Sequence, residues 1–273
     1  LADSVLGQTV SGSWIHESDV IDYVEEDVIM IPDLSTIRKI PWNKEPTAQI
    51  ICDLYYNSVS PSDIAPRQIL KNIIKTLSEE DMEAVVAPEL EFYLCEQNLD
   101  PDLPLKTPVG KSGRREMSSQ AFGVDAVNEF DKITDDIYDY CESLGIGVDT
   151  LVHESGPAQI EINLNHGNPL QLADQAFMFK RAVRQVALKH GVHATFMAKP
   201  YSSQPGSSMH IHQNLISTKT KENLFSDKEG NNTDLFLNYI GGLQQYLPDA
   251  MLFFAPYVNS YRRFVIDASA PIN

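Results

Sequence analysis

Three short segments of the chain alternate side chains that can bind cations with apolar side chains. The segments are "PELEFYL" (88–94), "AQIEINL" (158–164) and "MHIHQNL" (209–215). This period of two is typical of β-strands, in which residues i and i+2 share a face and lie about 6.6 Å apart. The polar faces carry Glu89, Glu91, Gln159, Glu161, Asn163, His210, His212 and Asn214, and Glu154 stands one short turn upstream of the second segment.

If the three polar faces line one sheet, four carboxylates and an imidazole crowd together. Like charges at such distances raise each other's pKa unless a cation neutralises them. Oxygen ligands with an imidazole and no thiolate favour Mg²⁺ or Mn²⁺ over zinc. Ions of this kind commonly bridge phosphates and stabilise their charge during phosphoryl transfer. The alternative is that each strand exposes an ordinary solvated face. The sequence therefore predicts a site for one or two divalent cations.

Two adjacent arginines, Arg262 and Arg263 in "NSYRRFV", offer planar donors for a carboxylate or a phosphate, or for an ordinary surface ion pair. Other catalytic motifs are absent from the sequence: there is no GxxxxGK[ST], no GxSxG and no HExxH. "GIGVDT" lacks the third glycine of a dinucleotide fingerprint, and Gly145 suits a helix end better. A Cys/His nucleophile stays open, but nothing singles out one of the three cysteines.

The elements that must position these residues follow from periodicity and turn residues. Strands are expected at 27–33, 48–56, 85–94, 152–164, 193–200 and 207–215, and helices from Pro66, over 125–144, from Asn168 to Gly191 and around 235–246. Residues 98–121 have no period, which predicts an ordered or mobile loop. Strands broken by proline and alternating with polar residues argue against a buried parallel sheet, so we expect an α+β fold.

Composition limits the class of protein. The 273 residues carry 38 acidic and 21 basic side chains, a formal charge of −17, which excludes nucleic acid and anionic membranes as partners and mildly favours a cationic substrate. Three cysteines without CxxC spacing indicate no disulfide framework and no structural zinc. With no apolar run near the roughly 20 residues of a membrane span and no signal peptide, we expect a cytoplasmic protein. Because the chain starts without methionine and stops at "SAPIN", we expect it to be truncated.

Five segments together resemble the glutamine synthetase family in order and spacing, over essentially the whole chain. They are "PELEFYL", "HESGPAQIEINLNHG", "ATFMAKP", "PGSSMHIHQNL" and "NSYRRFV". "ADQAFMFKRAVRQVALKHG" and "PDLSTIRKIPW" look closer to the γ-glutamylputrescine synthetase-like branch than to the ammonia-using enzymes. The resemblance implies an α+β catalytic domain over 61–273, with a curved antiparallel sheet and flanking helices, C-terminally incomplete. It also implies that residues 1–60 are the remnant of a small N-terminal β-grasp domain.

The same resemblance implies a function and assigns residues to it. The family joins L-glutamate to an amine at the expense of ATP, through a γ-glutamyl phosphate, in a homo-oligomeric ring with active sites at subunit interfaces. Two Mg²⁺ or Mn²⁺ ions would be held, one by Glu91, Glu154 and Glu161 and the other by Glu89 and His210. Gly206 and Arg263 would bind glutamate, with Arg263 catalytic, and Asp149, His212 and Asn214 would bind ATP.

Two departures from the family pattern bear on the substrates. Ser269 stands where ammonia-using members carry a flap glutamate, which leaves room for a larger amine such as putrescine or a related polyamine. Pro205 stands where an asparagine commonly precedes the substrate glycine, which affects part of the glutamate contact. The chain also ends before the family's later arginines and its last metal-ligand glutamate, so we expect this polypeptide alone to be inactive or very weak.

Three other functions stay open from the sequence. The first is a glutamine synthetase proper that uses ammonia. The second is a non-catalytic scaffold member of the family. The third is a different metal-dependent phosphotransferase, such as a guanidino kinase. Retention of all five expected metal ligands argues against the scaffold.

Overall fold

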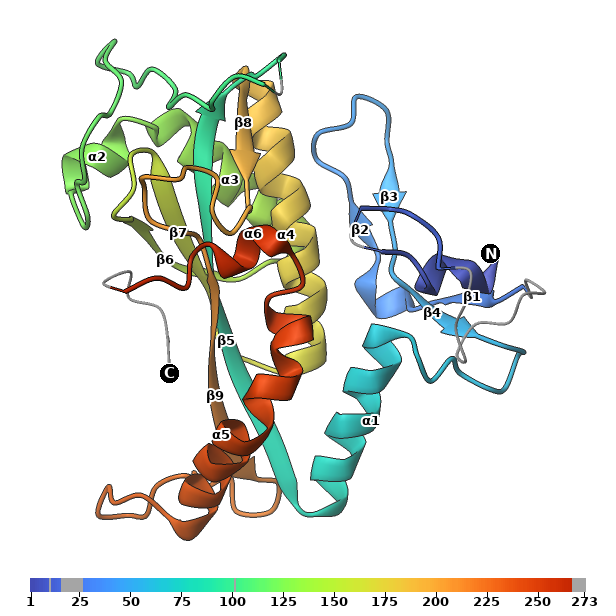
Figure 1. Cartoon of the computed structure of the whole chain (residues 1–273). Coiled ribbons are helices and arrows are strands. Elements are labelled where there is room, and N and C mark those ends of the chain that lie inside the picture. Colours follow the sequence, from blue (N-terminus) through green and yellow to red (C-terminus); the bar gives the residue numbers. More distant parts are fainter. Residues whose placement is uncertain (10, 16–26, 101, 267–273) are drawn as a thin grey trace. The chain divides into compact units, whose positions relative to one another are not determined.

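The computed structural model describes residues 1–9, 11–15, 27–100 and 102–266 (Figure 1). The chain forms two compact units, and each is described by itself. The first unit comprises Leu1–Arg38, Ala48–Val85 and Asn214–Asp249. The second comprises Lys39–Thr47, Val86–Gln213 and Ala250–Asn273, and it contains the three segments with polar strand faces except Asn214 and Leu215.

The N-terminal part of the first unit is built from short elements and one amphipathic helix, and the helical residues 234–249 also belong to this unit. Strands β1 and β4 pair antiparallel with Met30 opposite Leu54, and helix α1 begins with Pro66 in its first turn, as predicted. The elements up to this helix are η1 (Asp3–Leu6), β1 (Ile29–Pro32), η2 (Leu34–Thr36), β2 (Arg38–Lys39), β3 (Ala48–Gln49), β4 (Cys52–Tyr55) and α1 (Pro66–Glu79). Whether residues 1–60 are part of a β-grasp domain stays a prediction.

A five-stranded sheet organises the second unit. Its strands are β5 (Met82–Glu96), β6 (Val148–His153), β7 (Gln159–Leu164), β8 (Val192–Thr195) and β9 (Met209–Ser217), in the order β6-β7-β5-β8, with β9 also pairing with β5. The pairs of β5 with β7 and β8, and of β6 with β7, are antiparallel. Glu91 lies opposite Glu161, and Leu90 lies opposite Ile162. The expected separation of polar and apolar strand faces is therefore present.

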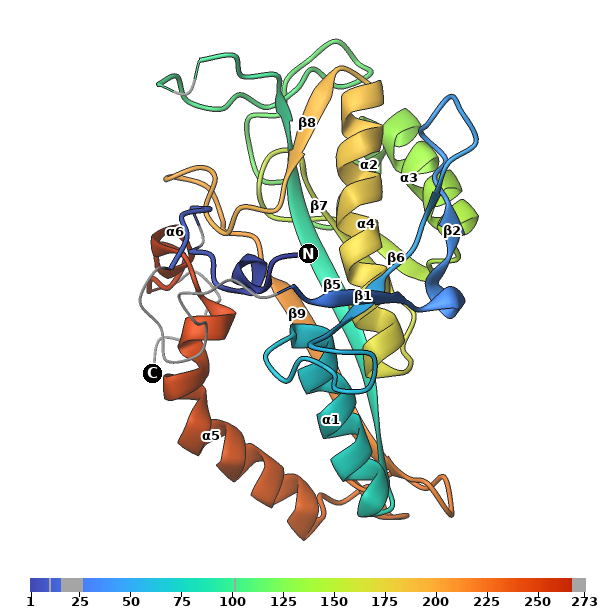
Figure 2. The same cartoon turned by 90° about the vertical axis from the view of Figure 1, so that its right-hand side faces the viewer.

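Two helices bury the apolar side of this sheet. Figure 2 shows α4 (Pro169–Lys189) running beside the strands, and α3 (Asp131–Leu144) packs on α4. The Asn168 side chain accepts hydrogen bonds from the first free amides of α4, so its side chain caps the helix as the sequence predicts. The fully buried side chains include Phe92, Leu94, Ile137, Ile160, Ile162, Phe179 and Val183.

Several boundaries differ from the sequence prediction. The helix expected over 125–144 is divided into α2 (Val124–Asn128) and α3, because the buried Phe130 leaves the helical conformation with φ −119° and ψ 22°. The turn expected between Glu154 and the strand that carries Glu161 is present, but the strand before it, β6, begins at Val148, where no strand was predicted. Helix α5 (Asp234–Phe254) is longer than predicted although it contains Pro248, and a short helix, α6 (Val258–Tyr261), follows it.

Helix α3 ends as the sequence predicts. Gly145 follows its last residue with φ 69°, the left-handed conformation that glycine adopts without strain. Among the described residues, no helix combines the length and the apolar character that crossing a membrane requires.

An ion cluster joins α1 to strand β4 and to Asp33, which directly follows β1. The Arg67 guanidinium donates to Asp53 at 2.6 Å and to Asp33 at 2.7 Å, and Lys71 donates to the second oxygen of Asp53. Hydrogen bonds from Ser35 and from Arg67 lower the pKa of the Asp33 carboxyl to about 2. The Arg67 side chain is only 15% exposed, so these contacts are weakly screened by solvent.

We expect Arg67→Met to lower the free energy of unfolding by roughly 2–4 kcal/mol, because it leaves two carboxylates without their shared partner. Urea unfolding would measure this. Lys75→Met is the matched control on the same helix, because Lys75 is exposed and lies 3.7 Å from Glu79, and its effect should stay within about 0.5 kcal/mol. Equal effects of the two substitutions would contradict the prediction.

The stability contributed by Asp33 should also depend on pH. Its folded pKa lies below the value of about 3.9 for an unfolded aspartate, so the contribution is complete above about pH 5 and is lost as the pH falls through the folded pKa. The difference in stability between wild type and Arg67→Met should therefore narrow between about pH 5 and pH 2. A difference that stays constant over this range would show that Asp33 does not pair with Arg67.

Candidate metal and substrate site

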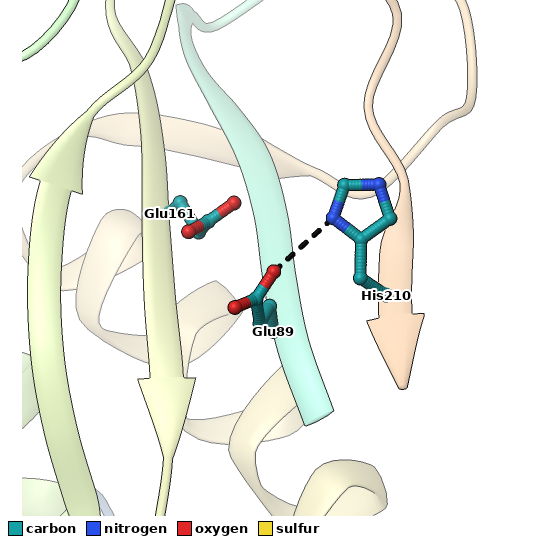
Figure 3. A group of neighbouring side chains, drawn as sticks. All are labelled: Glu89, Glu161 and His210. Carbon is teal, nitrogen blue, oxygen red and sulfur yellow. Dashed lines mark hydrogen bonds and ion pairs between the residues drawn. The ribbon is translucent and has the colours of Figure 1, made fainter. Parts of the chain in front are cut away.

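Three strands of the second unit bring candidate metal ligands together. Glu89 projects from β5, Glu161 from β7 and His210 from β9, and one ligand atom from each lies within 4.8 Å of the others. Figure 3 shows the two carboxylates close to each other, with the His210 ring on the other side of Glu89. The polar faces that the sequence predicts on separate strands therefore meet at one place.

Glu89 lies between two histidines. Its Oε2 atom is 3.2 Å from His210 Nδ1, and its Oε1 atom is 2.8 Å from His212 Nε2. Both imidazoles are more than half exposed, whereas the Glu89 side chain is mostly covered. The structure thus brings His212, expected at the ATP site, into contact with an expected metal ligand.

Glu91 is buried and tied by hydrogen bonds. Ser208 Oγ donates to one carboxylate oxygen at 2.8 Å, and the Ser208 amide and Gln159 Nε2 donate to the other at 3.2 and 3.1 Å. Burial raises the pKa of Glu91, and the bonds from Ser208 partly offset the effect. Ser208 Oγ also lies 3.0 Å from His210 Nε2. Sequence reasoning missed Ser208, although it stands two residues before His210 and so belongs to the same period.

The pKa of Glu161 is affected by the other carboxylates of the cluster. Burial, followed by the charges of Glu89, Glu154 and Glu91, raises its pKa to about 7. Among the described residues, no lysine or arginine forms an ion pair with any of these four carboxylates. Four carboxylates therefore share one region, and in the part of the chain that the structure describes no lysine or arginine lies at ion-pair distance from them.

The donor set fits a hard divalent cation. Carboxylate oxygens dominate it, an imidazole completes it and no thiolate takes part, which suits Mg²⁺ or Mn²⁺. The expected division of the ligands between two ions stays a prediction. The tightest group, Glu89, Glu161 and His210, takes one member from one expected set and two from the other.

Glu154 stands at the start of the turn that links β6 to β7. Its amide donates to Gln159 O at 2.9 Å, and its side-chain Oε2 accepts from the Ser155 amide at 3.1 Å. Gly156 in this turn packs directly on Tyr93, because a Cβ atom there would lie 1.9 Å from the phenol oxygen. The charge of Glu154 acts on both Glu91 and Glu161, so the turn faces the cluster.

The two residues expected to bind glutamate also meet. Arg263 donates to the Ser207 carbonyl at 2.8 Å, and a Cβ atom on Gly206 would lie 2.9 Å from Arg263 Cβ. Burial lowers the pKa of the half-buried Arg263, and the charge of Glu91 opposes this effect. Gln159 Nε2 donates to the Gly206 carbonyl at 2.9 Å as well as to Glu91, which connects this pair to the carboxylate cluster.

The remaining predicted residues lie elsewhere or outside the description. Asp149 occupies a bulge of β6. Burial, followed by the charges of Cys141 and Asp149, raises the pKa of Tyr138 on helix α3, so Asp149 lies near that helix. Asn214 follows His212 on β9, and its side-chain Oδ1 is buried without a partner among the described residues. Pro205 accepts a hydrogen bond from Tyr93 through its carbonyl, at 2.8 Å. Ser269 lies outside the described residues.

Comparison with known proteins gives a consistent family. Residues 63–273 match the family described as "Glutamine synthetase, catalytic domain". The γ-glutamylputrescine synthetase of Escherichia coli (strain K12) is 35% identical over 264 residues, which cover 96% of this chain and 56% of the relative. The glutamine synthetase of Methanocaldococcus jannaschii is 34% identical over 273 residues (96% and 58%), and the glutamate–isopropylamine ligase of a Pseudomonas species is 32% identical over 244 residues (87% and 51%).

Solved structures agree with these relatives. The structure titled "Apo GmaS without ligand" superposes with a TM-score of 0.76 at 26% identity, over 89% of this chain and 55% of that one. The structure titled "GmaS/ADP complex-Conformation 1" gives 0.73 at 28% identity, over 90% and 54%. The predicted α+β catalytic fold is thereby confirmed, and the chain spans about half the length of the curated relatives it matches. The matched residues make up most of the sequence, and the chain belongs to the glutamine synthetase family.

Proposed function

We propose that the whole protein is an ATP-dependent ligase that joins the γ-carboxylate of L-glutamate to a small amine. The observation that carries this proposal is the cluster of Glu89, Glu91, Glu161 and His210 on one sheet face with Glu154 on the adjoining turn, in which burial and the neighbouring charges raise the pKa of Glu161 to about 7. Membership of the family supports the same reaction class. Relatives whose names specify amines other than ammonia support putrescine or a related polyamine ahead of ammonia as the acceptor.

Glu89, Glu91, Glu154, Glu161 and His210 would hold Mg²⁺ or Mn²⁺, two or more ions in each site. When bound, the cations would neutralise the carboxylates and stabilise negative charge on the phosphates of ATP. The chain's own contribution is to keep these side chains close together at rest. Ser208 and Gln159 do this for Glu91, and the apolar backs of β5 and β7 do it for the strands.

Arg263 and Gly206 would orient glutamate. The guanidinium is fixed by the Ser207 carbonyl and half-buried, so its remaining donors can bind a carboxylate with little loss of side-chain freedom. Gly206 lets Arg263 pack closely against this loop, since a side chain there would collide with the Ala198 carbonyl and with Arg263. His212, Asp149 and Asn214 would contact ATP, and we extend the proposal to a ring of identical subunits with shared sites.

The chemistry requires activation of a poor electrophile. An oxygen of the γ-carboxylate attacks the γ-phosphorus of ATP, the bond to the β-phosphate oxygen breaks, and ADP leaves with the electron pair. The neutral amine then attacks the acyl carbon, inorganic phosphate leaves, and the nitrogen releases a proton. An ammonium nitrogen has no lone pair, so the amine must react in its neutral form.

ADP release by the full-length product of the coding region tests the reaction, because this chain spans about half of its relatives. We expect ADP only when glutamate and an amine are both present, with a higher kcat/KM for putrescine than for ammonium. Turnover of glutamate with ammonium but not with putrescine would identify a glutamine synthetase proper. Formation of ADP without glutamate would favour a different phosphotransferase, and no turnover would favour the scaffold.

Glu161→Gln should weaken binding of Mn²⁺ to the chain by about 10-fold to 100-fold or more, because it removes a ligand and one of the four charges. Electron paramagnetic resonance of free Mn²⁺ during a titration measures the affinity directly. Glu229→Gln is the control, because it removes the same charge from an exposed site distant in sequence from the cluster. Unchanged affinity in Glu161→Gln would mean that the strands carry only a solvated acidic face.

Arg263→Lys should raise the KM for glutamate by about 10-fold to 100-fold, because lysine cannot reproduce a planar bidentate contact. Steady-state kinetics at varied glutamate concentration, with ATP and amine saturating, would measure the change. The neighbouring Arg262→Lys is the control, since Arg262 is exposed. The same KM in both variants would remove Arg263 from the substrate site.

A further inference from the structure

A buried carboxylate from the long loop before α2 reaches the turn that carries Glu154. The Glu116 side chain is 4% exposed and the His153 side chain 0%. One oxygen of Glu116, Oε2, lies 2.9 Å from His153 Nε2 and accepts a hydrogen bond from the Ala158 amide at 2.5 Å. Oε2 of Glu116 therefore contacts both His153, which directly precedes the turn 154–158, and Ala158, the last residue of this turn.

The contacts of His153 indicate where the protons of the Glu116–His153 pair lie. His153 Nδ1 lies 2.7 Å from the carbonyl oxygen of Glu154, which can only accept, so Nδ1 carries a proton. The contact between Nε2 and Glu116 then needs a second proton between the two atoms. Glu116 thereby fixes the orientation of the ring, and the ring in turn holds the backbone of Glu154.

The turn itself needs such support. Ala158 is fully buried and adopts φ 57°, a left-handed conformation that residues other than glycine rarely take. Its amide is bound by Glu116 and its carbonyl accepts from the Leu94 amide at 2.9 Å. The strained residue is thus held from both sides, by the loop and by β5.

The loop is attached well enough to act as a support. Arg115 forms an ion pair with Glu96 at the end of β5, and the Phe122 amide donates to the His153 carbonyl at 2.8 Å. Thr107 Oγ1 donates to the Glu116 carbonyl at 3.2 Å. Glu116 is therefore anchored to the sheet on both sides in sequence.

We propose that Glu116 is a positioning residue: by holding His153 and the Ala158 amide with one oxygen, it sets the place of the Glu154 carboxylate beside Glu91 and Glu161. The inference rests on the proposed function, which assigns Glu154 to the cation site. It adds a residue from a loop that contributes no ligand of its own.

Glu116→Gln tests the inference while preserving size. A glutamine oxygen can accept from the Ala158 amide and from His153, but it carries no negative charge, so both bonds are weaker. In the flipped orientation its NH₂ group would oppose the Ala158 amide, so the substitution removes the charge that holds the turn. We expect the Mn²⁺ dissociation constant to rise about 10-fold to 100-fold, with an altered resonance spectrum of the bound ion. Glu129→Gln is the matched control, because this carboxylate directly after α2 accepts from the Ser112 amide of the loop at 3.1 Å and does not contact the turn, so the variant should bind Mn²⁺ as tightly as wild type.

A double-substitution cycle distinguishes positioning from a general loss of structure. If Glu116 acts through Glu154, then Glu116→Gln should change the affinity less than about 2-fold in a Glu154→Gln background. The same loss in both backgrounds, or wild-type affinity in Glu116→Gln, would overturn the inference. If Glu116→Gln does not fold, the same variants are compared in a chain that also carries Ala158→Gly. Glycine adopts the left-handed turn conformation without strain, so this chain depends less on Glu116 for folding.

The two proposals fail in different ways. If the wild-type chain does not bind Mn²⁺, the proposed function fails and this inference fails with it. If wild type and Glu129→Gln bind Mn²⁺ and Glu116→Gln binds equally well, only the role of Glu116 is refuted.

Discussion

Mutual repulsion among the carboxylates on one sheet face is the constraint that shapes the second unit. Glu91 and Glu161 lie directly opposite each other on paired antiparallel strands, an arrangement of like charges that destabilises a sheet. The opposite face of the same strands offsets this, because Leu90, Phe92, Ile160 and Ile162 are fully buried. The apolar face thus stabilises strands whose polar faces repel each other, and the pKa of Glu161 is raised by burial first and by the neighbouring carboxylates second.

The sheet register explains why much of this site could be predicted from the sequence. Side chains alternate between faces, so a slip of one residue would expose the aliphatic residues and bury the carboxylates. Such a strand has a strongly preferred register, and the pattern around Glu89, Glu161 and His210 was enough to predict that they share a face. The helix start at Asn168 and the helix end at Gly145 follow from equally local chemistry.

The features that could not be predicted depend on contacts between distant parts of the chain. Glu116 lies in a loop without a period, and its partner His153 is 37 residues away. The break before α3 occurs because Phe130 is drawn into the core, which the helical pattern around it does not reveal. Asp149 stands on a bulge, where the alternation that placed the other residues no longer applies. Period and spacing describe one strand or helix at a time, whereas these three positions are set by tertiary packing.

Gln159 shows how the packed strands make one site from two groups of residues. Its amide nitrogen lies 3.1 Å from Glu91, 2.9 Å from the Gly206 carbonyl and 3.3 Å from Ser207 Oγ, although the group carries only two protons. The three acceptors therefore share two donors, and a shift of any one changes the bonds to the others. Because Gln159 is itself buried and fixed by the Gly156 amide, the carboxylate cluster and the loop beside Arg263 are held in one mutual arrangement. Glu91 and the Gly206 loop are thus connected through the hydrogen bonds of a single buried side chain.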